Sequence, residues 1–184
     1  MPVDRILCHS RLPNTFLVMH NTIGKELLDT LSAIGMLVEE EGAVYSRVAV
    51  FCVDGFFIAT DHRFLFLKED VMKEEPVMYI GSDSLGLIQS APRYYSKSTL
   101  DLCTGSGVQA LIASRYSDTV LAVDINPRAV RFARFNAMLN GVDNMDVQLG
   151  SLYDGLEDCC FDTILANPPF VPSPNNETKF RDGG

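Results

Sequence analysis

The sequence predicts an α/β fold in which a parallel β-sheet carries a ligand site at one edge. From Thr99 onward, short β-rich apolar runs alternate with helix-compatible stretches. A glycine pair, Gly105 and Gly107, follows the first of these runs, and Asp124 closes the second. Alternating units of this kind require parallel strands, and we expect helices on both faces of the sheet.

Each element of this sheet follows from local patterning. Pro127 suits the first turn of a helix and Gly141 follows its end, which places a long helix between the second and third strands. The expected helices cover 107–116 and 127–140, and the expected strands cover 99–103, 119–124, 145–149 and 161–166.

Residues 1–80 are predicted to form a separate, small α+β subdomain ahead of a core over 81–184. An apolar stripe predicts a helix over 21–36, and the β-rich runs 44–53 and 56–60 flank Asp54-Gly55, a pair that suits a tight hairpin. A helix followed by a hairpin resembles a winged unit. Because the hairpin is aromatic with almost no basic residues, packing or substrate capping is favoured over DNA binding.

Composition limits the classes of partner. The formal net charge of −9 disfavours duplex nucleic acid, which proteins usually grip with clustered Lys and Arg. No apolar run approaches the ~20 residues that a membrane-spanning helix needs, and the first residues lack a secretory-signal layout, so a cytoplasmic location is expected. The five cysteines and three histidines lack metal-ligand spacing, which predicts free thiols and no metal site.

The glycine pair belongs to a recognisable pattern. Residues 105–110 (Gly-Ser-Gly-Val-Gln-Ala) fit G-x-G-x-x-G/A, in which missing side chains let the backbone approach a nucleotide-like ligand. Asp124 ends the next strand, where a carboxylate accepts hydrogen bonds from two ribose hydroxyls. A cap for the helix that follows is the alternative role of Asp124, and the two roles are compatible.

The run Asn167-Pro168-Pro169-Phe170 closes the fourth predicted strand. Two prolines cannot continue a strand or a helix, so they form a stiff turn at the carboxyl edge of the sheet, where open α/β folds bind ligands. The turn presents the Asn167 carboxamide and the Pro168 carbonyl as acceptors, with an aromatic ring at Phe170. The alternative is a rigid strand-ending loop with a buried Phe.

With these motifs, the chain resembles class I S-adenosylmethionine-dependent methyltransferases over about 77–184. The resemblance is to the branch that carries Asn/Asp-Pro-Pro-Tyr/Phe, which includes release-factor glutamine N-methyltransferases and adenine or guanine amino-group methyltransferases. It implies a Rossmann-like core and S-adenosylmethionine as the cofactor.

The resemblance also implies roles for individual residues. Cofactor binding is implied for both glycines of the loop and for residues at the ends of the first three strands. Of these residues, Asp101 is expected at the methionine end of the cofactor, Asp124 at its ribose and Ile125 against its adenine. Ser151 stands where the family commonly has an acidic residue. The implied cofactor residues are Asp101, Cys103, Gly105, Gly107, Asp124, Ile125, Ser151 and Leu152. The implied catalytic residues are Asn167 and Pro168, and the implied substrate-binding residues are Pro169 and Phe170.

The chemistry of methyl transfer agrees with the Asn-Pro-Pro-Phe motif. An amide or ring-amine nitrogen is a poor nucleophile because its lone pair is delocalised, and acceptors at Asn167 and Pro168 can align that lone pair by positioning and fixed dipoles. The proton can leave after transfer, so no His or Cys base is needed. We therefore predict a methyltransferase acting on a nitrogen of a planar amide or amine in a protein or small molecule.

Two other functions are considered. An open sheet of this type usually has more than the ~4 strands predicted here, so the core is expected to be incomplete, with a partner or second copy covering its exposed edge. A truncated, non-catalytic cofactor-binding or assembly module is the first alternative. An NAD-binding oxidoreductase shares the glycine loop and Asp124, but it gives no reason for Asn-Pro-Pro-Phe.

Overall fold

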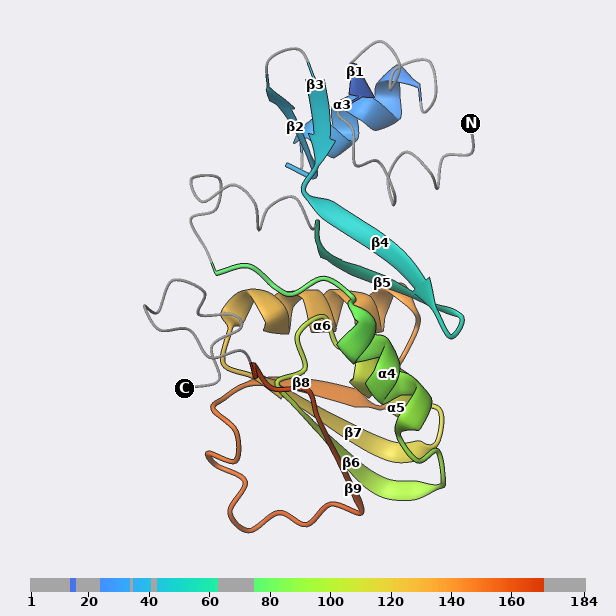
Figure 1. Cartoon of the computed structure of the whole chain (residues 1–184), viewed down its shortest axis with the longest axis vertical. Helices are drawn as coiled ribbons and strands as arrows, with labels where there is room; N and C mark the ends of the chain where they lie inside the picture. Colours follow the sequence, from blue (N-terminus) through green and yellow to red (C-terminus); the bar gives the residue numbers. More distant parts are fainter. Residues whose placement is uncertain (1–13, 16–23, 34, 41–42, 63–74, 171–184) are drawn as a thin grey trace.

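The computed structural model describes residues 14–15, 24–33, 35–40, 43–62 and 75–170 (Figure 1). The larger part, from residue 75 onward, is an α/β unit built on one parallel sheet. The smaller part consists of a short helix, a three-stranded antiparallel sheet and a two-stranded hairpin.

The central sheet confirms the predicted α/β class. Its strands are β6 (Ser96–Leu102), β7 (Ser117–Asp124), β8 (Met145–Leu149) and β9 (Thr163–Ala166), in the order β8-β7-β6-β9. All three pairings are parallel. The chain runs outward from β6 through β7 to β8, then returns to place β9 on the other side of β6.

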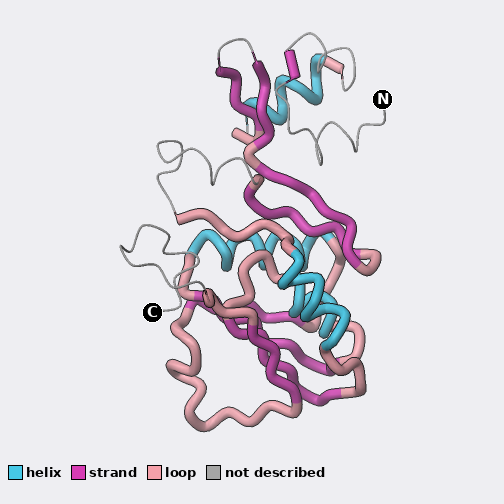
Figure 2. The backbone as a smooth tube through the Cα atoms, viewed as in Figure 1, coloured by secondary structure: helices cyan, strands magenta, loops and turns pink. Residues whose placement is uncertain are grey.

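The helices of the core lie on one face of this sheet (Figure 2). Both crossovers, β6 to β7 and β7 to β8, step in the same direction, so right-handed connections place α5 (Val108–Ala113) and α6 (Pro127–Leu139) on the same side. These helices bury small side chains against the strands: Ala110 of α5 and Ala133 of α6 share a cluster with Val120 and Val147 of the sheet.

The expectation of helices on both faces is therefore wrong for the described residues. The opposite face carries Leu100, Leu102 and Val123, which pack against Leu156 and Phe161 of the segment that joins β8 to β9. That segment is a string of turns with no helix.

The expectation of a winged unit in the N-terminal part is not confirmed. The helix expected over 21–36 is α3 (Lys25–Ala33), and residues 21–23 lie outside the described part. The β-rich run 44–53 divides at Arg47. Its first half, β3 (Ala43–Ser46), lies between β1 (Asn14–Thr15) and β2 (Leu37–Glu40) in an antiparallel sheet.

The second half of that run forms the predicted hairpin. Strand β4 (Val48–Val53) pairs with β5 (Phe56–Asp61), and the turn between them, Asp54-Gly55, has φ of 50° and 80°. Two successive positive φ values match the tight turn that the twist of a hairpin favours.

This hairpin packs on the C-terminal half of the chain. Phe56 and Ile58 share a hydrophobic cluster with Val108, Leu111 and Ala137. A polar contact supports the same packing: Asp61 is buried and pairs with Arg128 of α6, whose Nε donates to Asp61 Oδ2 at 2.8 Å. The division of the chain near residue 80 stays a prediction.

Asn136 of α6 joins the hairpin to the glycine loop. Its side chain is fully buried; Oδ1 accepts from the Ala59 amide at 2.8 Å, and Nδ2 donates to the carbonyls of Ala59 and Ser106, each at 2.8 Å. One carboxamide therefore satisfies backbone groups of β5 and of the loop after β6.

Replacing Asn136 with alanine is expected to lower the free energy of unfolding by about 1–3 kcal/mol, because buried backbone groups lose their partners. Urea unfolding measures this change. The matched control is Asn140→Ala one turn later, where the half-buried side chain bonds Phe57 in the same way but water can replace it. Equal losses for the two variants would contradict the assigned role of Asn136.

Candidate functional site

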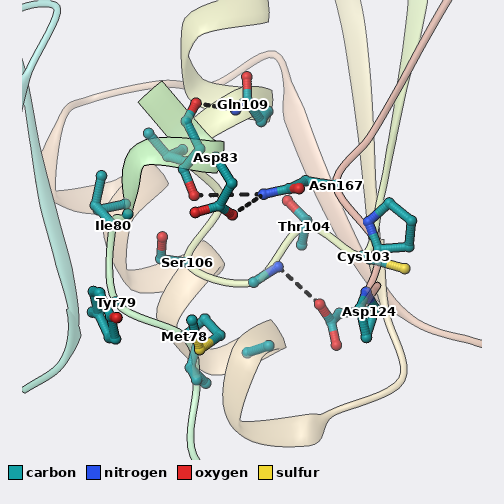
Figure 3. Close-up of a pocket in the computed structure, with 18 of the residues that line it drawn as sticks. Met78, Tyr79, Ile80, Asp83, Cys103, Thr104, Ser106, Gln109, Asp124 and Asn167 are labelled. Atoms are coloured by element: carbon teal, nitrogen blue, oxygen red, sulfur yellow. Dashed lines mark hydrogen bonds between the residues drawn. The ribbon is translucent and has the colours of Figure 1, made fainter. Parts of the chain in front are cut away.

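A cavity of about 740 Å³ opens at the carboxyl edge of the sheet (Figure 3). Its walls are the loop after β6, the end of β7, the turn after β9, and an extended segment over 75–81 that leads into α4 (Ser82–Ser90). Strand order reverses between β6 and β9, and ligands of open α/β sheets bind where the order reverses. The cavity therefore lies at the position that the topology favours.

The loop after β6 is built from residues with left-handed backbone. Cys103, Gly105 and Gly107 have φ of 55°, 57° and 83°. A side chain at Gly105 would meet only Val77 Cγ1, 4.0 Å away, in the wall of the cavity. At Gly107, by contrast, an added Cβ would lie 3.0 Å from Ala133 Cβ of α6, and Gly107 lies outside the cavity lining. The first glycine thus leaves room beside the cavity, and the second lets two helices approach.

Asp124 connects the end of β7 to this loop. Its Oδ2 accepts from the Gly105 amide at 2.8 Å and its Oδ1 accepts from the Asn126 amide at 2.9 Å. Burial raises the pKa of Asp124, an effect that these hydrogen bonds oppose. The cap of α6 is Asn126, whose side chain accepts from the Arg128 amide at 2.9 Å, so the capping role considered for Asp124 is wrong.

Asp101 lies beneath the loop, almost fully buried. Its Oδ2 accepts from Thr104 Oγ1 at 2.5 Å and from the Ala110 amide at 3.1 Å. Its Oδ1 is buried and has no hydrogen-bond partner among the described residues. Burial raises the pKa of Asp101 from 3.8 to about 7, with a smaller contribution from the nearby charge of Asp124.

Asn167 enters the cavity from the end of β9. Its Nδ2 donates to Asp83 Oδ2 at 2.9 Å and lies 3.5 Å from Ser84 Oγ, both on α4 (Figure 3). Pro168, Pro169 and Phe170 follow along the cavity wall. Phe170 is 66% exposed, so the alternative of a buried Phe in a strand-ending loop is wrong.

Comparison with known proteins identifies the family. A family model for the methyltransferase small domain matches residues 79–180, more than half of the chain. The chain belongs to the methyltransferase small domain family. The family resemblance inferred from the sequence motifs is thereby confirmed.

Relatives of this methyltransferase domain include proteins named for protein methylation. A Methanocaldococcus jannaschii protein named as a protein N5-glutamine methyltransferase is 32% identical over 108 residues, 58% of this chain and 54% of that protein. The ribosomal protein L11 methyltransferase of Caldicellulosiruptor bescii is 38% identical over 107 residues, 54% of this chain and 34% of the relative. The release factor glutamine methyltransferase of Thermodesulfovibrio yellowstonii is 35% identical over 74 residues, 39% of this chain and 26% of the relative.

The chain thus matches only part of the length of these methyltransferases: 54% of the first and 34% of the second. The residues that the family model matches, 79–180, include the glycine loop, Asp124 and the Asn-Pro-Pro-Phe turn. The activity, substrates and partners of the whole protein are for this reason treated as proposals below.

The methyltransferase domain brings most of the sequence-predicted site residues together. Eight line the cavity: Cys103, Gly105, Asp124, Ile125, Asn167, Pro168, Pro169 and Phe170. Four do not line it: Asp101, Gly107, Ser151 and Leu152. Asp101 and Gly107 support the loop from behind, whereas Ser151 and Leu152 follow β8. The adenine contact expected at Ser151 stays a prediction.

Sequence reasoning missed one whole wall of the site. The sequence predicts no site residue before Asp101, but residues 75–81 are extended without strand pairing and line the cavity together with the first turn of α4. Met78, Tyr79, Ile80 and Asp83 come from this wall (Figure 3). The available signal was an apolar and aromatic run directly before a short helix.

The described residues include no group of three or more His, Cys, Asp or Glu side chains that could hold a metal ion. Cys52, Cys103, Cys159 and Cys160 are free thiols, and Cys8 lies outside the described part. Within that same part, every helix is too short or too polar to cross a bilayer.

Proposed function

We propose that this chain is the S-adenosylmethionine-binding part of a methyltransferase that acts on a planar amide or amine nitrogen of a protein. The observation that carries the proposal is the meeting of two motifs in one cavity. Gly105 and Asp124 form one side, and Asn167, from a distant strand, forms the other. Family membership supplies the reaction class.

The residues present fit the cofactor. Asp124 offers carboxylate oxygens at the cavity wall for ribose hydroxyls, and Ile125 is 70% exposed there, which suits contact with a flat base. Asp101 hydrogen-bonds the glycine loop through Oδ2, and its Oδ1 has no partner among the described residues. When bound, S-adenosylmethionine supplies a sulfonium methyl: the new nitrogen–carbon bond forms as the sulfur–carbon bond breaks, its electron pair returns to sulfur, and the nitrogen proton leaves to solvent.

The residues after β9 fit the acceptor. The Asn167 carboxamide oxygen and the Pro168 carbonyl can accept the N–H groups of the acceptor, and the exposed ring of Phe170 can stack on a planar group. Fixed acceptors act by positioning the nitrogen and by favouring the charge that develops on it. No side-chain base is required of this site.

A protein acceptor is favoured over duplex nucleic acid. Several relatives are named for glutamine residues of proteins or for ribosomal protein L11, and the net charge of −9 opposes binding to a polyanion. A small-molecule acceptor is the second candidate, since the cavity also fits one in size. A partner or second copy against the edge of the sheet, and a cytoplasmic location, stay predictions.

Replacing Asp124 with alanine tests the cofactor site. The variant is expected to bind S-adenosylmethionine more weakly by about 1–3 kcal/mol, the scale of a lost hydrogen bond to a charged group. Calorimetric titration measures this change. The control is Asp118→Ala on the same strand, where the exposed side chain bonds Tyr95 far from the cavity lining. Unchanged affinity in the Asp124 variant, or an equal loss in the control, would contradict the assignment.

A further inference from the structure

We propose that Asp83 is a positioning residue, which turns the Asn167 carboxamide so that its oxygen faces the methyl acceptor. This inference rests on the proposed function, because it deepens the role of Asn167 in the same site. The contact that carries it joins Asn167 Nδ2 to Asp83 Oδ2 at 2.9 Å, across the cavity from β9 to α4 (Figure 3).

The chemistry of the pair decides which end of the carboxamide faces α4. An ionised carboxylate has acceptors and no donor, whereas a carboxamide has one of each. Only Nδ2 can therefore bond Asp83, and Oδ1 must point the other way. Both hydrogen-bonding contacts of this carboxamide within the described residues, to Asp83 and at longer range to Ser84, involve Nδ2. The oxygen is left for an N–H of the acceptor.

The position of Asp83 is itself fixed from the glycine-loop side. Asp83 lies in the first turn of α4, next to Ser84. The Ser84 carbonyl accepts from Gln109 Nε2 at 3.0 Å, and Gln109 is buried on α5, directly after the glycine loop. The helix that carries Asp83 is thus tied to the element that carries the cofactor loop.

An unfixed carboxamide would serve the acceptor poorly. Its two orientations differ by a half-turn that exchanges oxygen and nitrogen, and the wrong one presents N–H groups to the N–H groups of the acceptor. Asp83 removes that orientation without touching the acceptor. Its loss is expected to lower kcat about tenfold, while the affinity for S-adenosylmethionine stays the same.

The test compares Asp83→Ala with Asp83→Asn and with Ser90→Ala. Asp83→Asn retains an acceptor for Nδ2 and is expected to recover part of the lost turnover. Ser90→Ala is the control within α4, since within the described part of the chain Ser90 Oγ bonds only carbonyls of its own helix, and Ser90 is not among the residues that line the cavity. Turnover is measured with S-adenosylmethionine and a glutamine-containing peptide, and kcat and KM are determined separately.

A second readout does not depend on methyl transfer. The side-chain amide resonances of Asn167, assigned in a nitrogen-15-labelled chain by comparison with Asn167→Ala, are expected to shift on Asp83→Ala and to stay in place in Ser90→Ala. Unmoved Asn167 resonances, or unchanged kcat in Asp83→Ala, would overturn the positioning role. If Asp83→Ala shifts the Asn167 resonances while the wild-type chain shows no turnover, the orientation of Asn167 is supported and the result counts against the proposed function instead.

Discussion

Replacing Gly107 with alanine is expected to lower the free energy of unfolding by about 2–4 kcal/mol, because two costs add. Gly107 has φ of 83°, a left-handed conformation that alanine adopts at a cost of about 1–2 kcal/mol. The added Cβ would also lie 3.0 Å from Ala133 Cβ, 3.1 Å from its Cα and 3.2 Å from Met145 Cε. Two of these atoms belong to the packed helix α6, which cannot yield without moving the sheet contacts beneath it.

The control for this prediction is Gly141→Ala. Gly141 also has a left-handed φ, 65°, but a Cβ there would meet nothing within 4 Å. This variant isolates the conformational cost, so it should lose at least ~1 kcal/mol less than Gly107→Ala in urea unfolding. Equal losses would show that α5 and α6 do not need close approach at Gly107.

The second large effect is a dependence of stability on pH that arises from Asp101. Its pKa is about 7 in the folded protein and near 4 when unfolded, so between these values the folded state holds a proton that the unfolded state has lost. The contribution of Asp101 to stability is therefore greatest at low pH. It declines as the pH rises through this window and is constant above it.

Replacing Asp101 with asparagine removes this titration. The free energy of unfolding of the wild type minus that of Asp101→Asn is expected to fall by about 2–3 kcal/mol between pH 5 and pH 8, at ~1.4 kcal/mol for each pKa unit. Urea unfolding of both proteins at each pH measures it, and titrating groups that do not interact with Asp101 cancel in the difference. A difference that is constant with pH would show that the buried Asp101 does not retain a proton.

The sequence predicted the central sheet, and most of the site residues it named line the cavity, because those features depend on short-range patterns. Apolar runs alternating with helical stretches require parallel strands, and parallel strands bring their carboxyl ends to one edge. Gly105, Asp124 and Asn167 each follow a strand, so their meeting at one cavity follows from topology. The phenylalanine after Asn-Pro-Pro was placed correctly at the same edge.

What the sequence did not predict depends on contacts between distant segments. The run 44–53 is uniformly β-prone, and nothing local shows that it divides at Arg47 between two sheets. The role of Gly107 required knowing that Ala133 packs against it. Asp83 was missed because a helix-terminal carboxylate is common, and only the fold brings it to Asn167.

The measurement that tests the central claim most directly is a calorimetric titration of the native chain with S-adenosylmethionine, with NAD as the comparison. The account predicts saturable binding of S-adenosylmethionine, weakened in Asp124→Ala and unchanged in Asp118→Ala, with no binding of NAD. A folded chain that binds NAD equally well, or that binds neither ligand, would contradict it. In the second case, the cavity would belong to an assembly module that has the methyltransferase fold without its cofactor.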